Sequence, residues 1–377
     1  MTLPEVHLIA GSCSEAVKLA PVVIAMRSAG LLAPVLVAGG QHPAAVTQAL
    51  VAFDLVPEVT LTAGAAPPTE MIKQLDQLWA GRPPAAVIVQ GDTMTSLSGA
   101  LAARWRRIPV VHLEAGRRAG EPFPDEADRR LLTQLTALHL APTPLAAMNL
   151  LDEGIPTGNV LITGSTAVDA TLAVAGRTLP FESVAVEQAR SDRRLVLVTG
   201  RSSQAALAAI AILTANYPDI EVIVTGAAVE NRERVTATGP LSYPDRSRLL
   251  SEAYLVLTDS GGVLAEAPSF GVPALVLGAA TERVESLRAG YAKLVGFDTD
   301  LIVREASALL DSRLRRDAMG AGGNPYGDGQ AAARSAQATA ALLGLAERPE
   351  PMPSTQAATV SQSAPDTFGR ASWAAKK

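Results

Sequence analysis

Short apolar runs rich in β-branched residues alternate with helical patterns through the first half of the chain. Between the runs, residues 15–28, 95–106 and 125–138 repeat apolar positions at intervals of three and four, which is typical of amphipathic helices. This alternation predicts parallel βαβ units. The predicted strands are Val6–Ala10, Pro34–Ala38, Ala86–Gln90, Val110–Leu113 and Val160–Thr163.

A second series of the same kind begins after the polar segment 183–194. We therefore expect an α/β protein with two doubly wound domains and an interdomain cleft, divided as residues 1–188 and 189–322. Residues 347–377 lack apolar periodicity and predict a disordered tail. The strands predicted in the second domain are Leu195–Thr199, Ile220–Thr225, Tyr254–Thr258 and Ala274–Leu277.

Composition and charge indicate which binding partners and which cellular compartment to expect. The 377 residues carry a net charge of −5 without a long basic run, so nucleic acid is not an expected partner. The single cysteine, Cys13, excludes an internal disulfide and fits a reducing compartment. The chain shows neither a signal peptide nor an apolar run of about twenty residues, so we expect a cytoplasmic protein without a membrane partner.

Two of the predicted strands end in a carboxylate beside glycine. Asp92 follows Ala86–Gln90 after Gly91, and Glu114 follows Val110–Leu113. In open α/β sheets the carboxyl ends of the strands border the ligand crevice, which makes both acids candidates for catalysis. The alternative is that they only cap loops, and two strands that end alike make it the weaker reading.

Small-residue turns predict where an anion could bind. The turn at residues 11–14 leads into a helix that carries Lys18, although such turns are often only compact caps. The stronger candidate is Ser260-Gly261-Gly262, because paired glycines let a diphosphate approach a helix end. Glu266, one turn further on, is a candidate acceptor for ribose hydroxyls or else a solvated helix residue, and Arg283 is a candidate for the phosphates.

The segment 122–130 opens a helix with acids first and arginines after. Asp125 complements the helix dipole and also stands four residues before Arg129, which allows an ion pair within the helix. The four histidines, His7, His42, His112 and His139, are not spaced as metal ligands. We therefore expect no metal site and no cofactor.

Nine ordered motifs together resemble the non-hydrolysing UDP-N-acetylglucosamine 2-epimerases over residues 6–345. They are EAVKLAP at 15–21, GQH at 40–42, QGDT at 90–93, HLEAG at 112–116, PDEADR at 124–129, HLAPT at 139–143, TDSGGVLAEAP at 258–268, TER at 281–283 and NPYGDG at 324–329.

The resemblance implies two Rossmann-like domains in a glycosyltransferase B-type arrangement, with residues 323–346 returning as a helix to the first domain. It also implies a homodimer that interconverts UDP-N-acetylglucosamine and UDP-N-acetylmannosamine for surface polysaccharides, by eliminating and re-adding UDP. Asp92, Glu114 and Asp125 match positions around the sugar, and Lys18 matches a nucleotide contact. Lys18 and Arg129 join these three acids as candidate catalytic residues. Residues that match nucleotide contacts are Ser260, Gly261, Gly262, Glu266 and Arg283, with Arg201 as a further anion ligand.

The chain departs from the family pattern at several of these positions. Cys13-Ser14 replaces the family's Arg-Pro, and Arg201 replaces its catalytic histidine and cannot exchange protons as an imidazole does. Asp125 is one methylene shorter than the family's glutamate. An active 2-epimerase is therefore the leading hypothesis, beside a non-catalytic nucleotide-sugar-binding or regulatory relative and a hydrolytic relative that releases UDP. A sugar-transfer enzyme is the weakest of the alternatives.

Overall fold

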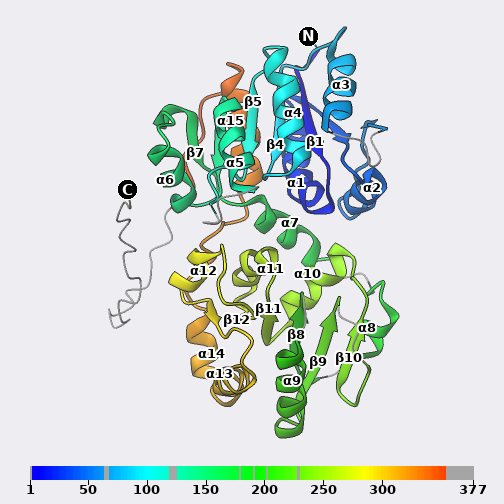
Figure 1. Cartoon of the computed structure of the whole chain (residues 1–377), viewed down its shortest axis with the longest axis vertical. Coiled ribbons are helices and arrows are strands. Elements are labelled where there is room, and N and C mark those ends of the chain that lie inside the picture. The colour runs from blue at the N-terminus through cyan, green and yellow to red at the C-terminus, as the bar shows by residue number, and fades with distance from the viewer. Residues whose placement is uncertain are drawn as a thin grey trace, which may run out of the picture.

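Two parallel sheets, each covered by helices on both faces, form the two halves of the computed structural model (Figure 1). The structure describes residues 2–62, 68–118, 125–177, 180–189, 192–200, 203–226 and 230–353, apart from the side chain of Asp125. The predicted α/β architecture with two Rossmann-like sheets is confirmed.

The first sheet has seven strands in the order β3-β2-β1-β4-β5-β6-β7, all parallel. The order reverses between β1 and β4, and such a switch point is where open α/β sheets bind ligands. The strands are β1 (Glu5–Ala10), β2 (Ala33–Ala38), β3 (Val59–Thr60), β4 (Ala86–Gln90), β5 (Val110–Leu113), β6 (Leu138–Ala141) and β7 (Val160–Ile162). The helices are α1 (Cys13–Ala29), α2 (Pro43–Val51), α3 (Pro68–Trp79), α4 (Met94–Trp105), α5 (Asp125–Leu135), α6 (Pro144–Asp152) and α7 (Thr166–Ala175).

The second sheet repeats this topology with the order β10-β9-β8-β11-β12-β13, and its switch point lies between β8 and β11. Its strands are β8 (Arg194–Thr199), β9 (Ile220–Thr225), β10 (Val235–Thr238), β11 (Leu255–Thr258), β12 (Ala274–Val276) and β13 (Ala292–Leu294). The helices are α8 (Val184–Ala189), α9 (Gln204–Asn216), α10 (Tyr243–Glu252), α11 (Gly261–Glu266), α12 (Val284–Arg288), α13 (Thr299–Asp311), α14 (Arg313–Met319) and α15 (Ala331–Leu342).

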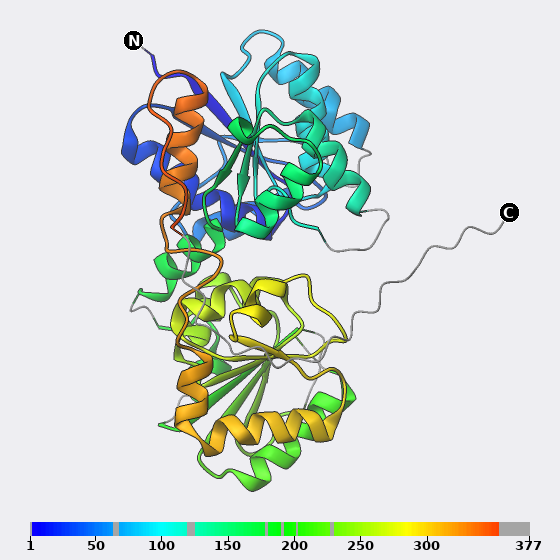
Figure 2. The same cartoon turned by 90° about the vertical axis from the view of Figure 1, so that its left-hand side faces the viewer.

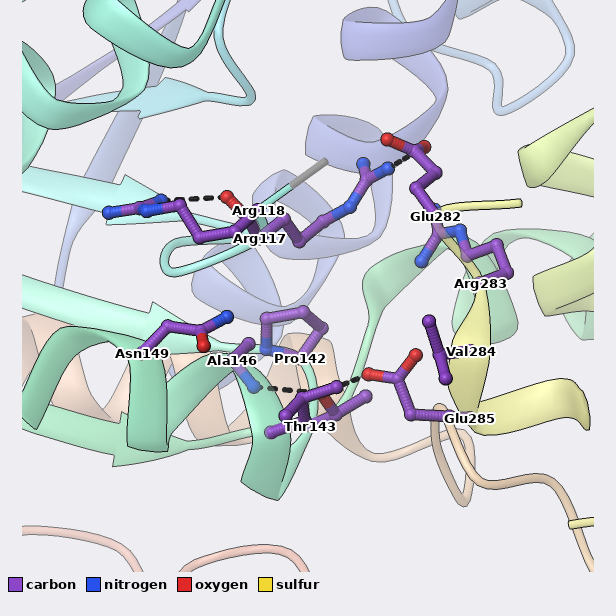
Figure 3. Close-up of a pocket in the computed structure, with 11 residues that line it drawn as sticks. Arg117, Arg118, Pro142, Thr143, Ala146, Asn149, Glu282, Arg283, Val284 and Glu285 are labelled. Atoms are coloured by element: carbon purple, nitrogen blue, oxygen red, sulfur yellow. Dashed lines mark hydrogen bonds and ion pairs between the residues drawn. The ribbon is translucent and has the colours of Figure 1, made fainter. Parts of the chain in front are cut away.

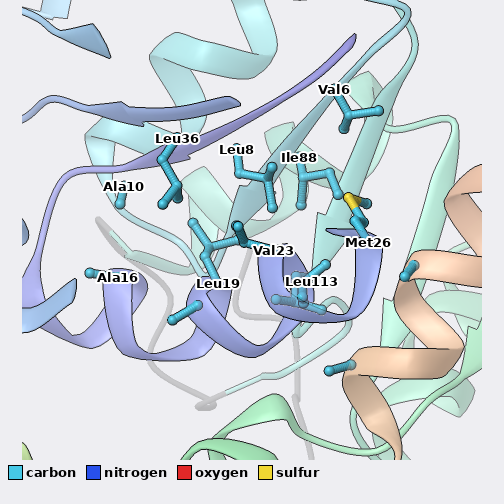
Figure 4. Packing of buried hydrophobic residues seen from close by; sticks show 14 of the residues in the cluster. Val6, Leu8, Ala10, Ala16, Leu19, Val23, Met26, Leu36, Ile88 and Leu113 are labelled. Atoms are coloured by element: carbon cyan, nitrogen blue, oxygen red, sulfur yellow. The ribbon is translucent and has the colours of Figure 1, made fainter. Parts of the chain in front are cut away.

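The core of the first half explains why α1 forms where it does. Leu8 and Ile88 of the sheet are fully buried beside Leu19, Val23 and Met26 of α1 (Figure 4). Fully burying a side chain of this size contributes about 1.5–3 kcal/mol. Helix α15 packs against α1 and α7, so this helix lies on the first half although α14 lies on the second (Figure 2).

Two predicted boundaries were wrong. The helix expected over 125–138 ends at Leu135, because Leu138–Ala141 is fully buried as β6 beside β5. Residues 347–353, expected as part of a disordered tail, lie along β7. There the Met352 backbone N donates to the Ile162 carbonyl at 2.7 Å, and Arg348 donates to the carbonyls of Gly158 and Val160.

Candidate functional site

Asp92 and Glu114 lie at the carboxyl ends of neighbouring strands, β4 and β5. Gly91 has φ +73°, and Glu114 itself has φ +64°, a left-handed conformation that is uncommon outside glycine. Such strained positions are typical of functional sites, where surrounding structure fixes a side chain that the backbone alone would not place. Both acids are thus on one rim, as the sequence predicted.

Glu114 is a buried carboxylate surrounded by cations. It is 3 % exposed, and neither carboxylate oxygen has a hydrogen-bond partner among the residues that the structure describes. Burial alone would raise its pKa, but the positive charges of Lys18, Arg283 and Arg117 outweigh burial and lower the pKa of Glu114. The carboxylate is therefore ionised at neutral pH and free to accept a proton or a hydrogen bond.

Lys18 faces this carboxylate from α1. Its side chain is buried, and burial lowers its pKa, as do Arg117 and Arg283, whereas Glu114 opposes the shift. Its ammonium nitrogen forms neither a hydrogen bond nor a close ion pair with any residue that the structure describes. An ammonium group placed in this way lacks a close anion, which a ligand phosphate would supply.

Asp92 is held by Arg129 of α5. Both Nε and Nη2 of Arg129 lie 2.5 Å from Asp92 Oδ2. The same guanidinium lies 3.5 Å from Glu126, and Glu126 in turn lies 3.1 Å from Arg118. Arg129 therefore pairs with Asp92, in the loop after β4. The side chain of Asp125, its expected partner within the helix, lies outside the described part of the structure.

The glycine pair of the second half opens α11 at the switch point of the second sheet. Ser260 is the N-cap, and its Oγ accepts from the Val263 backbone N at 3.5 Å. A Cβ atom at Gly261 would lie 3.2 Å from Glu282 Oε1 and 3.5 Å from Arg283 Nε. Gly261 thus lets two charged side chains approach the helix end, and Gly262 leaves space in front of it.

Glu266 is buried, so the alternative that it is a solvated helix residue is wrong. It is 3 % exposed, and Arg246 Nη2 lies 3.0 Å from each of its carboxylate oxygens. The Tyr243 hydroxyl is 3.4 Å from Oε1. A ribose hydroxyl would therefore have to share an oxygen with Arg246.

A pocket lies between the two halves, lined by residues of both (Figure 3). Arg117 reaches across it to pair with Glu282, and the Thr143 hydroxyl donates to Glu285 Oε1 at 2.7 Å. Arg283 is 3 % exposed, stacks 5.1 Å from the Tyr326 ring centroid, and leaves its Nε without a partner among the described residues. The pocket is lined by Arg117, Arg118, Pro142, Thr143, Leu145, Ala146, Asn149, Glu282, Arg283, Val284 and Glu285.

Two N–H groups of the first-strand turn are already bonded within the chain and are not open to an anion. Glu15 Oε2 accepts from the backbone N of Gly11 at 2.5 Å and of Ser12 at 3.1 Å, completing a capping box. Cys13 is exposed, and its Sγ lies 3.4 Å from the Ala45 carbonyl. Arg201, expected to hold an anion at the end of β8, lies outside the described residues.

Within the described part of the chain, no group of three His, Cys, Asp or Glu side chains could hold a metal ion. His112 and His139 are register partners on β5 and β6, but both are buried in the sheet. Burial lowers the pKa of His112 to about 4 and that of His139 to about 3. In the same part of the chain, no helix combines the length and apolar character needed to cross a membrane.

Sequence reasoning missed three charged residues of this site: Arg117, Glu282 and Arg246. Arg117 follows HLEAG directly and Glu282 precedes Arg283, so adjacency to two motifs was the signal available. No such signal marks Arg246, because its pairing with Glu266 depends on how α10 packs beside α11. The structure brings together Lys18, Asp92, Glu114, Arg129, Ser260, Gly261, Glu266 and Arg283 around the junction of the two halves.

Comparison with known proteins identifies the family. The family model for UDP-N-acetylglucosamine 2-epimerase matches residues 25–340. The Salmonella typhimurium UDP-N-acetylglucosamine 2-epimerase is 35 % identical, over 87 % of this chain and 96 % of its own. An S. aureus structure described as an MnaA-UDP complex has a TM-score of 0.83 at 31 % identity, covering 93 % of this chain and 100 % of that one.

A third relative is the Neisseria meningitidis UDP-GlcNAc 2-epimerase, whose structure was solved bound to UDP-GlcNAc. It has a TM-score of 0.78 at 29 % identity and covers 87 % of this chain and 97 % of its own. Sequence and fold therefore agree over nearly the whole described chain, and the protein belongs to the UDP-N-acetylglucosamine 2-epimerase family.

Proposed function

We propose that this protein interconverts UDP-N-acetylglucosamine and UDP-N-acetylmannosamine. The single observation that carries the proposal is Glu114, a buried, ionised carboxylate with unpartnered oxygens that faces Lys18 of the first half and Arg283 of the second. Membership of the family supports the substrate, since a relative was solved with UDP-GlcNAc bound.

The proposed chemistry is elimination followed by re-addition. A carboxylate removes the proton on C2 while the bond from C1 to the β-phosphate oxygen breaks, giving a glycal and UDP. UDP oxygen then attacks C1 again, and a proton returns to the opposite face of C2. Asp92 and Glu114 are the proposed acid and base, because both lie on the rim and proton transfer needs groups fixed within hydrogen-bond reach.

The departing diphosphate develops negative charge that must be stabilised. Lys18 and Arg283 are the proposed cations, and the N-terminal backbone of α11 at Ser260, Gly261 and Gly262 is the proposed phosphate cradle. Arg129 acts on the sugar side by fixing Asp92. Glu266 is proposed to contact the ribose with the lone pairs that Arg246 leaves unused.

A second candidate is a relative that binds the nucleotide sugar without turning it over, or that hydrolyses it. The sequence favours keeping this candidate, because Arg201 stands where the family has its catalytic histidine and Cys13 where it has an arginine. An arginine retains its proton near neutral pH and cannot serve as the exchanging acid or base.

Proton NMR of the protein with UDP-N-acetylglucosamine in deuterated water tests these proposals. Epimerisation predicts deuterium at C2 together with a new manno anomeric signal. Hydrolysis predicts free sugar and stoichiometric UDP, and a binding protein predicts an unchanged spectrum. In Glu114→Gln, we expect turnover to fall by about 10²–10⁴-fold while UDP still binds, since only proton transfer is lost.

We further propose a cytoplasmic homodimer whose product supplies surface polysaccharide synthesis. The family resemblance supports the dimer and the pathway, and the single cysteine fits a reducing compartment. Light scattering coupled to size-exclusion chromatography tests the dimer, which predicts about twice the chain mass of 39.0 kDa.

A further inference from the structure

Three cations meet between the halves. Lys18, Arg117 and Arg283 interact electrostatically with one another, and the carboxylates that act on Lys18 or Arg117 include Glu15, Asp92, Glu114 and Glu282. Burial lowers the pKa of Arg117, and repulsion by the positive charge of Arg283 lowers it further. Arg283 is buried and its Nε has no partner among the described residues, so an anion that is not part of the chain would complete this group of cations.

Arg117 and its neighbour Arg118 are anchored differently. Arg118 is fully engaged by the first half, with Nε and Nη2 at 2.8 and 2.7 Å from the Glu153 carboxylate oxygens and Nη2 at 3.2 Å from the Thr133 hydroxyl. Arg117 points the other way, across the pocket, and its ion-pair partner is Glu282 of the second half (Figure 3). Arg118 is thus structural, whereas the side chain of Arg117 pairs, within the described part of the chain, with one carboxylate at the mouth of the site.

Glu282 occupies the position where a phosphate is expected. Its Oε1 lies 3.2 Å from where a Cβ of Gly261 would be, against the first residue of α11. Its Oε2 lies 3.7 Å from Arg129 Nη2, so one carboxylate neutralises cations from two elements of the first half. Its side chain is 33 % exposed and can move toward solvent.

We infer that Arg117 binds the diphosphate of the nucleotide sugar, and that Glu282 is the internal counterion that the diphosphate displaces. The inference rests on the proposed function for the identity of the ligand. It assigns to Arg117 the cationic role that the sequence lacks at Cys13, and it makes Glu282 a competitor of the substrate rather than a ligand for it.

Calorimetric titration of Arg117→Met with three probes tests the proposed role of Arg117. We expect the Kd for UDP and for inorganic pyrophosphate to rise by about 10- to 100-fold, which is the range for loss of a charged hydrogen bond. The Kd for uridine, which has no phosphate, is expected to stay the same. Arg82→Met, which removes a surface cation paired with Glu5, is the matched control and is expected to bind all three probes as the wild type does.

Glu282→Gln tests the proposed role of Glu282 as the displaced counterion. Removing the competing charge is expected to tighten pyrophosphate and UDP binding by about 3- to 10-fold, within the range of a modest charge interaction. Unchanged or weaker binding in this variant would overturn the role of Glu282. Wild-type affinity for UDP in Arg117→Met, or an equal loss of uridine binding, would overturn the role of Arg117.

The outcomes separate this inference from the proposed function. If UDP binding depends on Arg117 while the NMR experiment shows no turnover, the proposed epimerisation fails and the diphosphate ligand stands. If epimerisation occurs and Arg117→Met retains wild-type KM and UDP affinity, the inference fails alone. If the wild-type protein binds neither UDP nor pyrophosphate, both are wrong.

Discussion

Arg246 Nη2 lies at equal distances, 3.0 Å, from the two carboxylate oxygens of Glu266. Glu266 is buried, and burial raises its pKa, an effect that Arg246 and Lys18 oppose. Arg246 also lies 4.9 Å from the ring centroid of Tyr243, whose hydroxyl contacts the same carboxylate. The acid proposed to contact ribose is therefore paired with a cation from α10, which opposes the rise in its pKa.

Replacing Arg246 should therefore destabilise the protein. Arg246→Met leaves Glu266 buried without its cation, and we expect the free energy of unfolding to fall by about 3 kcal/mol. The double variant Arg246→Met/Glu266→Gln should lose less, because no uncompensated charge remains. Urea unfolding measures both. Arg313→Met, which removes a cation 88 % exposed on the surface, should change stability by about 0.5 kcal/mol or less. Equal losses in the single and double variants would contradict the role of charge.

The contact between Arg129 and Asp92 predicts a kinetic effect. Arg129→Lys keeps the charge but loses the two-nitrogen contact, and misplacing Asp92 should lower kcat by about 10- to 100-fold. KM should change little, since the diphosphate ligands remain. Arg130→Lys alters the next residue, which is 68 % exposed, and should leave both constants unchanged. A matching loss of thermal stability without a kcat effect would indicate that Arg129 is only structural.

His139 predicts how stability depends on pH. Its two ring nitrogens lack partners among the described residues, and burial lowers its pKa to about 3. Because the unfolded state binds the proton more readily, stability is lost as pH falls below 6.5, by about 2 kcal/mol at pH 5. His139→Leu should remove this loss and keep the stability at pH 7.

The measurement is the difference in unfolding free energy between pH 7 and pH 5 for the two proteins. Asp169, whose pKa burial raises to about 6, acts in the opposite direction but is common to both and cancels. A pH dependence that is the same in His139→Leu and in the wild type would show that His139 is not held neutral by the fold.

Residues 347–353 predict a difference between two truncations. A chain ending at Pro353 retains Met352, which is 8 % exposed and donates to the Ile162 carbonyl, together with the contacts of Arg348. A chain ending at Ala346 loses both. Burial of one methionine and a few hydrogen bonds amount to about 3 kcal/mol, so the shorter chain should unfold at a clearly lower temperature. Coincident melting curves would show that this segment does not stabilise the sheet edge.

The sequence by itself determined the alternation of strands and helices and the rim acids. Strands such as Ala86–Gln90 and Val110–Leu113 were predicted at their observed bounds, because a parallel strand buried on both faces is a local apolar run. Glu114 follows its run directly and Asp92 follows after Gly91, so their shared rim could be predicted from order alone.

Only the tertiary structure decided which charges meet. Arg117 and Glu282 are 165 positions apart, and their pairing depends on how the two halves pack. Glu266 gained a counterion because α10 lies beside α11, and Leu138–Ala141 became a strand because β5 offered an edge. Hydrophobic periodicity is a local property that a sequence records, whereas the partner of a charged side chain is set by distance in space.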